Sequence, residues 1–204
     1  NVAIGGDSMF GIPTGQAVTG VVAIGLEACK GSGSTTTNID GTVAVGRAAL
    51  KVLTTGANNT AIGFNALAEA TLASNNVALG YRALDAIVGD VAGNAGHYNI
   101  AIGVDSMGGV NAGTHATALT DSNIAIGTNA LIGASFVGAD LDLLGNVVIG
   151  HHAMASTSNN AQTGTIAIGY QSLNALTSGQ YNTAIGYNSM DEHLTGRANT
   201  CLGW

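Results

Sequence analysis

The side chains with the most specific chemistry in this sequence are five histidines: His97, His115, His151, His152 and His193. A metal ion needs several ligands that converge on one point at set spacing. His151 and His152 are neighbours in an expected turn, where one ring would face inward and the other outward. In an assembly of three chains, one histidine per chain could form a ring on the axis, but solvated turn residues are the simpler interpretation. We therefore predict no metal site.

No residues occur in the pattern that an enzyme or a cofactor site requires. In segment 30–35, Lys30 precedes two glycines, whereas the lysine of a phosphate-binding loop follows them. The Gly-x-Ser-x-Gly motif of a nucleophilic serine is absent. The carboxylates expected in loops or turns lack a matched partner for acid–base chemistry. They include Asp90, Asp140, Asp142, Asp191 and Glu192. The sequence predicts neither an enzyme nor a bound cofactor.

Aromatic side chains follow a repeated glycine at five places: Phe64, Tyr81, Tyr170, Tyr187 and Trp204. The interval from Phe64 to Tyr81 equals the intervals from Tyr170 to Tyr187 and from Tyr187 to Trp204. Residues that recur at the repeat length lie above one another in a stacked structure, so we expect the rings to stack. Contact with carbohydrate is the alternative role for such rings.

The composition of the 204-residue chain limits its class. Glycine supplies 31 residues, about 15%, which is roughly twice the usual share, and charged residues are only 8%. A hydrophobic fraction of 46% argues against disorder, and a single proline excludes collagen. The net charge of −7 gives no basic footprint for nucleic acid. The longest apolar stretches are too short, and too broken by glycine, to span a membrane.

One repeat accounts for the whole chain, which we treat as a single domain over 1–204. Its most regular feature is a glycine that returns at spacings of about 17 to about 24 residues, which gives a basic unit of about 17 residues with insertions. The repeats end at Gly5, Gly25, Gly46, Gly63, Gly80, Gly103, Gly127, Gly150, Gly169, Gly186 and Gly203.

Each position before the glycine has its own chemistry. Counting back from the glycine, the first residue is a large aliphatic one, the second is small and the third is β-branched. The fourth is usually asparagine. Such a run is typical of a short strand, and the glycine turns a corner. A Ser/Ala-Met/Leu pair after the corner predicts a second short strand. The expected fold is all-β, a parallel β-solenoid of about eleven coils. Stacking places equivalent positions above one another, so the aliphatic residues form a ladder and the asparagine side chains can hydrogen-bond along the stack. These structural ladders include Ile62, Leu79, Ile102, Ile126, Ile149, Asn59, Asn76, Asn99 and Asn123.

The two faces of the strand are both apolar. We expect the aliphatic column, which contains Ile62, Ile102 and Ile126, to be almost fully buried inside the coil. The nearly invariant alanine column is then expected to lie against a partner chain, which predicts a parallel homotrimer with a total charge of 3 × −7 = −21. Cys29 and Cys201 lie about nine coils apart, far beyond the ~7 Å that a disulfide allows between Cα atoms. We expect both to be small core residues.

The segments NTAIGFNAL at 59–67 and NTAIGYNSM at 182–190 resemble the head repeats of trimeric autotransporter adhesins. They resemble even more closely the related repeats of phage tail fibres, often found upstream of an intramolecular chaperone. The resemblance covers the whole chain and implies a left-handed, parallel β-roll trimer. The adhesin repeat is shorter than the basic unit of this chain, and this chain has longer insertions.

The longest insertions fall in three consecutive coils, at about 85–98, 108–122 and 132–145, within a belt at about 85–145. Variable loops on a rigid scaffold commonly carry binding, although these rather apolar loops could instead pack on one another or on a neighbouring chain. The candidate contacts are Tyr98, His115 and Phe136. We predict an extracellular structural module of a phage tail fibre or surface adhesin that attaches to a host glycan or protein.

A self-assembling extracellular filament subunit without a receptor is the alternative function, and a glycan-cleaving tailspike is a weaker one. The expected partners are two identical chains and neighbouring fibre segments, without nucleic acid or membrane insertion. The chain starts and stops within a repeat, so we expect a segment of a longer fibre or end-to-end stacking. The first residues do not resemble a signal peptide, although export signals could lie outside this piece.

Overall fold

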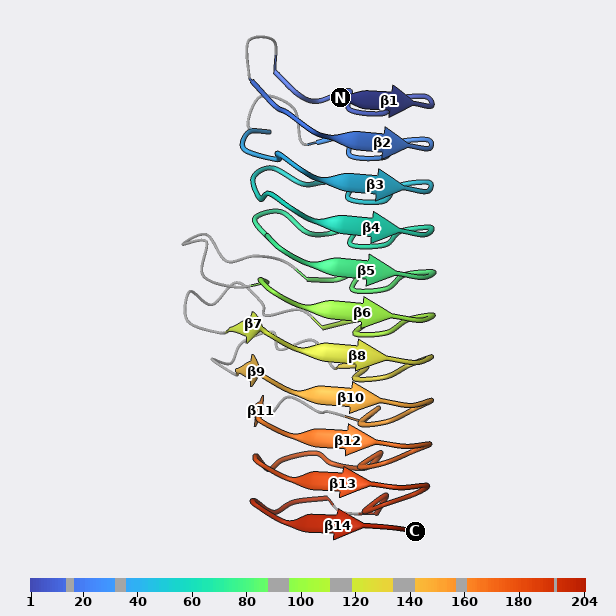
Figure 1. The fold of residues 1–204 in the computed structure, drawn as a ribbon, viewed down its shortest axis with the longest axis vertical. Coiled ribbons are helices and arrows are strands. Elements are labelled where there is room, and N and C mark those ends of the chain that lie inside the picture. The colour runs from blue at the N-terminus through green and yellow to red at the C-terminus, as the bar shows by residue number, and fades with distance from the viewer. Residues whose placement is uncertain are drawn as a thin grey trace.

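The computed structural model shows an all-β parallel solenoid in which the chain climbs by one coil per repeat (Figure 1). The structure describes residues 1–13, 17–31, 36–87, 96–110, 119–133, 142–156, 161–192 and 194–204. No helix occurs within these ranges. The all-β parallel solenoid predicted from the repeat is confirmed.

The main sheet contains eleven three-residue strands, one from each repeat, and every neighbouring pair is parallel. The register places equivalent repeat positions opposite one another, so that Ala61 pairs with Ala78 and Ile62 with Leu79. The strands are β1 (Val2–Ile4), β2 (Val22–Ile24), β3 (Val43–Val45), β4 (Thr60–Ile62), β5 (Val77–Leu79), β6 (Ile100–Ile102), β8 (Ile124–Ile126), β10 (Val147–Ile149), β12 (Ile166–Ile168), β13 (Thr183–Ile185) and β14 (Thr200–Leu202).

A second, smaller sheet forms where the insertions leave the solenoid. It has the order β11-β9-β7 and is also parallel. Its strands are β7 (Thr120–Asp121), β9 (Leu143–Leu144) and β11 (Gln162–Thr163). The bases of the loops in these coils therefore continue the stacking of the main sheet.

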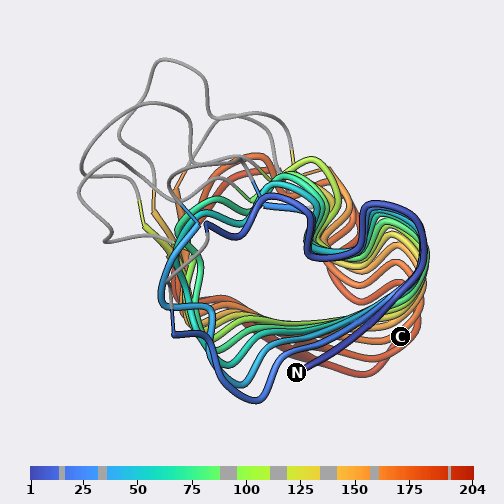
Figure 2. The ribbon, with the colours of Figure 1, turned by 90° about the horizontal axis from the view of Figure 1, so that it is seen from above.

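The repeated glycine is required by both conformation and space. Gly25 has φ +131°, in the region that other residues resist, and a Cβ there would lie 2.6 Å from the carbonyl oxygen of Gly46 in the next coil. Neighbouring corners stack so closely that no side chain fits between them. Viewed from above, the coils superimpose on a closed, flattened ring with one inward fold (Figure 2).

The predicted second strand after the corner is wrong. In its place is a turn in which the second and fourth residues after the glycine have left-handed φ values, such as 54° at Asn65 and 53° at Leu67. The turn still bonds to the next coil, since the Leu67 N–H donates to the Ala83 carbonyl at 3.0 Å. Its left-handed backbone allows two consecutive residues, Ala66 and Leu67, to be fully buried. A strand would have sent them to opposite faces.

The interior of the solenoid is the reverse of the predicted one. From β2 to β13 the alanine column is completely buried and packs in one cluster with the Leu/Met column of the turn, whereas Ala3 in β1 is exposed and Cys201 in β14 is half-buried. The aliphatic column faces outward: Ile62 is 38% and Leu79 is 43% exposed, while Ile102, Ile126 and Ile149 are half-buried. The prediction that this column is almost fully buried is wrong for the chain on its own. The coil is thin, so small side chains fill the position opposite the long side chains of the turn: alanine in most coils and Val148 in β10.

A ladder of hydrogen-bonded asparagine side chains lies just before the strands of the main sheet. Asn59, Asn76, Asn99 and Asn123 are fully buried. Each Oδ1 accepts hydrogen bonds from the backbone N–H and the Nδ2 of the next asparagine, as from Asn99 to Asn76 at 2.9 and 3.2 Å. The same Nδ2 also donates to a loop carbonyl, for example that of Thr120 at 2.8 Å. The hydrogen bonding predicted from the asparagine spacing is therefore present.

Candidate functional site

The histidines do not assemble a metal site in the described part of the chain, where no group of three His, Cys, Asp or Glu side chains could hold an ion. The Nδ1 atom of His97 accepts the Ser74 backbone N–H at 3.0 Å, and the Nε2 atom of His152 lies 3.1 Å from Asn129 Nδ2. These two rings therefore have structural partners. His115 and His193 lie outside the described residues.

The two cysteines are free thiols at separate levels of the stack. Cys29 takes the place of a leucine in the turn column, and Cys201 takes the place of an alanine in the strand column. Burial raises the pKa of the Cys29 thiol to about 11, because an apolar environment disfavours the thiolate. Cys29 is consequently a core residue, as predicted, and a poor nucleophile.

The first and third residues of every strand in the main sheet form a mostly apolar outer face. From β2 to β13 the middle residue is buried, while its two neighbours are half-buried or exposed. The strands stack in register along the solenoid (Figure 1), so equivalent outward positions line up in two columns. Contiguous exposed apolar surfaces of this kind mark interaction sites.

The predicted stacking of aromatic rings is confirmed. Phe64 and Tyr81 stack with their ring centroids 5.4 Å apart, and Tyr170 and Tyr187 do so at 5.0 Å. Trp204 meets Tyr187 edge-on at 6.3 Å. The interplanar angles of the first two pairs are 9° and 8°, so these rings cover each other's faces. Stacking covers part of each ring, but Tyr81, Tyr170 and Tyr187 remain about half exposed, so contact with carbohydrate stays a prediction.

Two further residues belong to the aromatic column, although the sequence analysis missed them. His151 stacks on Tyr170 with the centroids 5.3 Å apart, and the Arg47 guanidinium lies 5.5 Å from the Phe64 ring centroid. Both directly follow a repeated glycine, like the aromatic residues themselves. Their repeat position would have identified them without any structure.

The belt of long insertions is described only in part. Tyr98 lies in a left-handed turn with φ +59°, is 62% exposed and contacts the His97 ring edge-on. The other two candidate contacts, His115 and Phe136, lie outside the described residues. Aspartates anchor the described bases of the loops: Asp121 Oδ1 accepts the His97 N–H at 2.7 Å, and Asp142 Oδ1 accepts the Leu119 N–H at 3.1 Å.

Ion pairs on the described surface engage three basic residues. Lys30 lies 2.9 Å from Glu27, and Lys51 lies 3.1 Å from the same carboxylate. Hydrogen bonds from Lys30 and then Lys51 hold the pKa of Glu27 below its ordinary value. Arg82 bonds to Asp85 at 2.7 Å, which raises the pKa of the guanidinium. The cation of each pair is partly exposed to solvent, which screens the interaction and reduces its contribution to stability.

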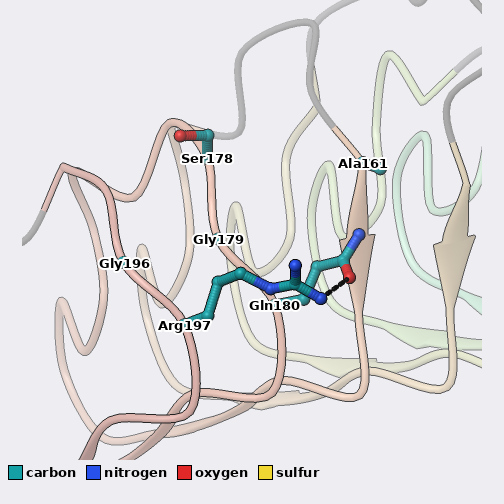
Figure 3. Close-up of a pocket in the computed structure, with 6 residues that line it drawn as sticks. All are labelled: Ala161, Ser178, Gly179, Gln180, Gly196 and Arg197. Carbon is teal, nitrogen blue, oxygen red and sulfur yellow. Dashed lines mark hydrogen bonds between the residues drawn. The ribbon is translucent and has the colours of Figure 1, made fainter.

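A shallow polar pocket of about 380 Å³ lies beside the last coils, and the sequence analysis did not predict it. It is lined by Ala161, Ser178, Gly179, Gln180, Gly196 and Arg197 (Figure 3). The Arg197 Nη2 group donates to Gln180 Oε1 at 3.1 Å, and the guanidinium lies 5.8 Å from the Tyr181 ring centroid. Gln180 and Arg197 occupy the same position in consecutive repeats, which is the signal that could have paired them.

Comparison with known proteins places the chain in no group, because no family model, curated protein or solved structure matches it. Within the described ranges, no helix is long and apolar enough to cross a membrane.

Proposed function

We propose that the chain is a structural module of an extracellular fibre, a phage tail fibre or a surface adhesin, that contributes to attachment to a host cell or surface. The observation that carries this proposal is the outer face of the in-register stack, which is mostly aliphatic with threonine at the first position of β4, β13 and β14. Eleven strands at a spacing of ~4.8 Å extend about 48 Å. The resemblance of segments 59–67 and 182–190 to tail-fibre and adhesin repeats supports the same function.

The outer face gives the proposed homotrimer a different interface from the one expected from the sequence. The alanine column belongs to the core of each coil, so it cannot contact another chain. The β-branched and large aliphatic columns supply the apolar side chains that two further copies would cover. Thin folds with little core of their own commonly gain stability from oligomerisation. A parallel arrangement would align the outer faces of three chains along their whole length.

Attachment is assigned to the belt, where the insertions leave the regular solenoid. Tyr98 is the described candidate contact, because it is an exposed aromatic residue held in a fixed turn between two ordered coils. Aromatic residues are enriched at the energetic centres of interfaces. The proposed partner is a glycan or protein of the host surface.

Electron microscopy of the purified chain tests the fibre proposal. We expect short rods, about 48 Å long per segment, whose end views show three lobes. Single-lobed end views would contradict the trimeric fibre module.

Attachment is tested separately, by measuring how much labelled chain is retained on a panel of intact bacterial cells. We expect retention on at least one cell type and a loss on the Tyr98→Ala variant. Failure to bind any of the cells would contradict the attachment role. Equal retention of the variant and the parent chain would show that Tyr98 does not contribute to attachment.

A further inference from the structure

We infer that the pocket between Gln180 and Arg197 binds the carboxylate of an acidic saccharide. This inference goes beyond the proposed attachment through the belt, because it places a second binding site beside the last coils and names the class of its ligand. The pocket volume of about 380 Å³ falls at the small end of the ~300–1,000 Å³ range of small-molecule sites. It therefore suits one or two small polar groups rather than a folded partner.

Arg197 provides the charge that would recognise an anion. Lys30, Lys51 and Arg82 each have a carboxylate within 4 Å, whereas Arg197 has none among the described residues. Its guanidinium carries five N–H donors in a planar fork, and the bond to Gln180 uses one of them. A carboxylate is the planar, bidentate acceptor that this fork matches best.

The surroundings of Arg197 hold the guanidinium in place before a ligand arrives. Gln180 Oε1 accepts from Nη2, and the half-exposed Tyr181 ring lies beneath the cation. Figure 3 shows the arginine side chain extended along the pocket toward Gln180, with Ala161 on the far side. A side chain already ordered in this way loses less conformational entropy on binding. The Nε2 group of Gln180 is positioned to donate to the same ligand.

Glycine keeps the floor of the pocket open. Gly179 and Gly196 have φ values of +134° and +142°, and a Cβ on Gly179 would collide with the Gly196 carbonyl oxygen. The backbone is therefore bare at both positions. The lining residues include no large apolar side chain. This combination of peptide groups, an amide and a guanidinium suits a ligand with hydroxyl groups and a carboxylate better than an apolar one.

Titration with D-glucuronic acid, followed by NMR, tests the inference, with D-glucose and acetate as matched probes. We expect glucuronate to bind in the millimolar range and to shift the signals of Arg197 and Tyr181. Glucose and acetate should each bind about tenfold more weakly, since each lacks half of the recognised chemistry. Equal binding of glucose would overturn the role of the carboxylate, and equal binding of acetate would overturn the role of the sugar.

Variants locate the binding at this pocket. Arg197→Ala should weaken glucuronate binding about tenfold or more, and Arg197→Lys should recover only part of the loss because it lacks the planar fork. Arg47→Ala is the matched control: this arginine also lies over a ring without a carboxylate partner among the described residues, but it is far from the pocket. An unchanged affinity in Arg197→Ala, or an equal loss in Arg47→Ala, would overturn the inference.

Sedimentation of the same samples separates this inference from the proposed function. A trimer that fails to bind glucuronate would overturn the ligand class and leave the fibre module intact. A monomer that binds glucuronate through Arg197 would support the pocket and overturn the proposed assembly.

Discussion

Ala101 and Ile102 are neighbours in β6, yet they belong to two regions with different requirements. Ala101 is fully buried and packs in one cluster with the turn column of its own chain. Ile102, on the other side of the same strand, is only half-buried and has no further layer of the described chain above it. The interior is thus completed within one chain. In the proposed trimer, the inner column folds each coil and the outer columns join it to coils of the other chains.

The inner turn column should give the largest effect on folding. Leu131→Ala removes a fully buried side chain and leaves a cavity, so we expect the free energy of unfolding to fall by about 2–5 kcal/mol per chain. Denaturant unfolding followed by circular dichroism measures the change. Leu26→Ala is the matched control, because Leu26 is exposed on the outside of its coil, and it should cost less than about 1 kcal/mol. Equal losses would contradict the assignment of inside and outside.

The asparagine ladder should give the next largest effect. Asn99→Ala leaves the buried Asn123 N–H and the Thr120 carbonyl without their partners, so we expect a loss of about 1–3 kcal/mol. The midpoint of denaturant unfolding reports it. Asn174→Ala, at a half-buried asparagine outside the ladder, should have a smaller effect. A loss at Asn174 as large as that at Asn99 would show that the ladder has no special role.

The ladder can also be extended. Thr165 interrupts it between Asn146 and Asn182, and its Oγ1 is buried with no hydrogen-bond partner among the described residues. In Thr165→Asn, a carboxamide could accept from Asn182 and donate to Asn146 Oδ1, so we expect a gain of about 0.5–1.5 kcal/mol. The melting temperature should rise accordingly. A fall would mean that the site cannot hold the larger side chain.

The surface charges should contribute least, and their effect has a definite sign. Lys30 and Lys51 lower the pKa of Glu27 in the folded chain, so this carboxylate stabilises the fold above its ordinary pKa of 4.5. That contribution is lost as the pH falls through the lower, folded value. Thermal melting from pH 7 to pH 3 should show a smaller acid-induced decrease in Glu27→Gln than in the parent chain. An identical decrease in the two proteins would show that Glu27 does not contribute to the loss of stability in acid.

The regular spacing of glycine and asparagine was enough to predict the parallel stack, the strand positions and the hydrogen bonds between Asn59, Asn76, Asn99 and Asn123. It was not enough to decide which side of the strand faces inward. Alternation shows that Thr60 and Ile62 share a face, but both faces of this strand are apolar. The deciding feature was the turn at Asn65 and Leu67, whose left-handed backbone sends long side chains into a narrow interior. Sequence patterns do not reveal that conformation, since ordinary residues adopt it only under tertiary constraint.

The candidate sites also differ in whether the repeat pattern predicts them. The aromatic stack was predictable because its members recur at one repeat position. The pocket was not, because Gln180 and Arg197 differ in type and become partners only when consecutive coils bring their side chains together. The belt residues lie in insertions that have no repeat, so the repeat pattern gives no position for them. Of the three candidates, Tyr98 lies within the described residues.

Sedimentation equilibrium at micromolar concentration tests most directly the claim that the outer face joins three chains. One chain has a mass of 20.1 kDa, and the parent protein should sediment at three times that mass. The double variant Ile102→Asp/Ile126→Asp, which places charge on the outer face alone, should be monomeric while keeping its β-sheet circular dichroism. A folded parent protein that sediments with the mass of a single chain, or a double variant that remains trimeric, would contradict the account.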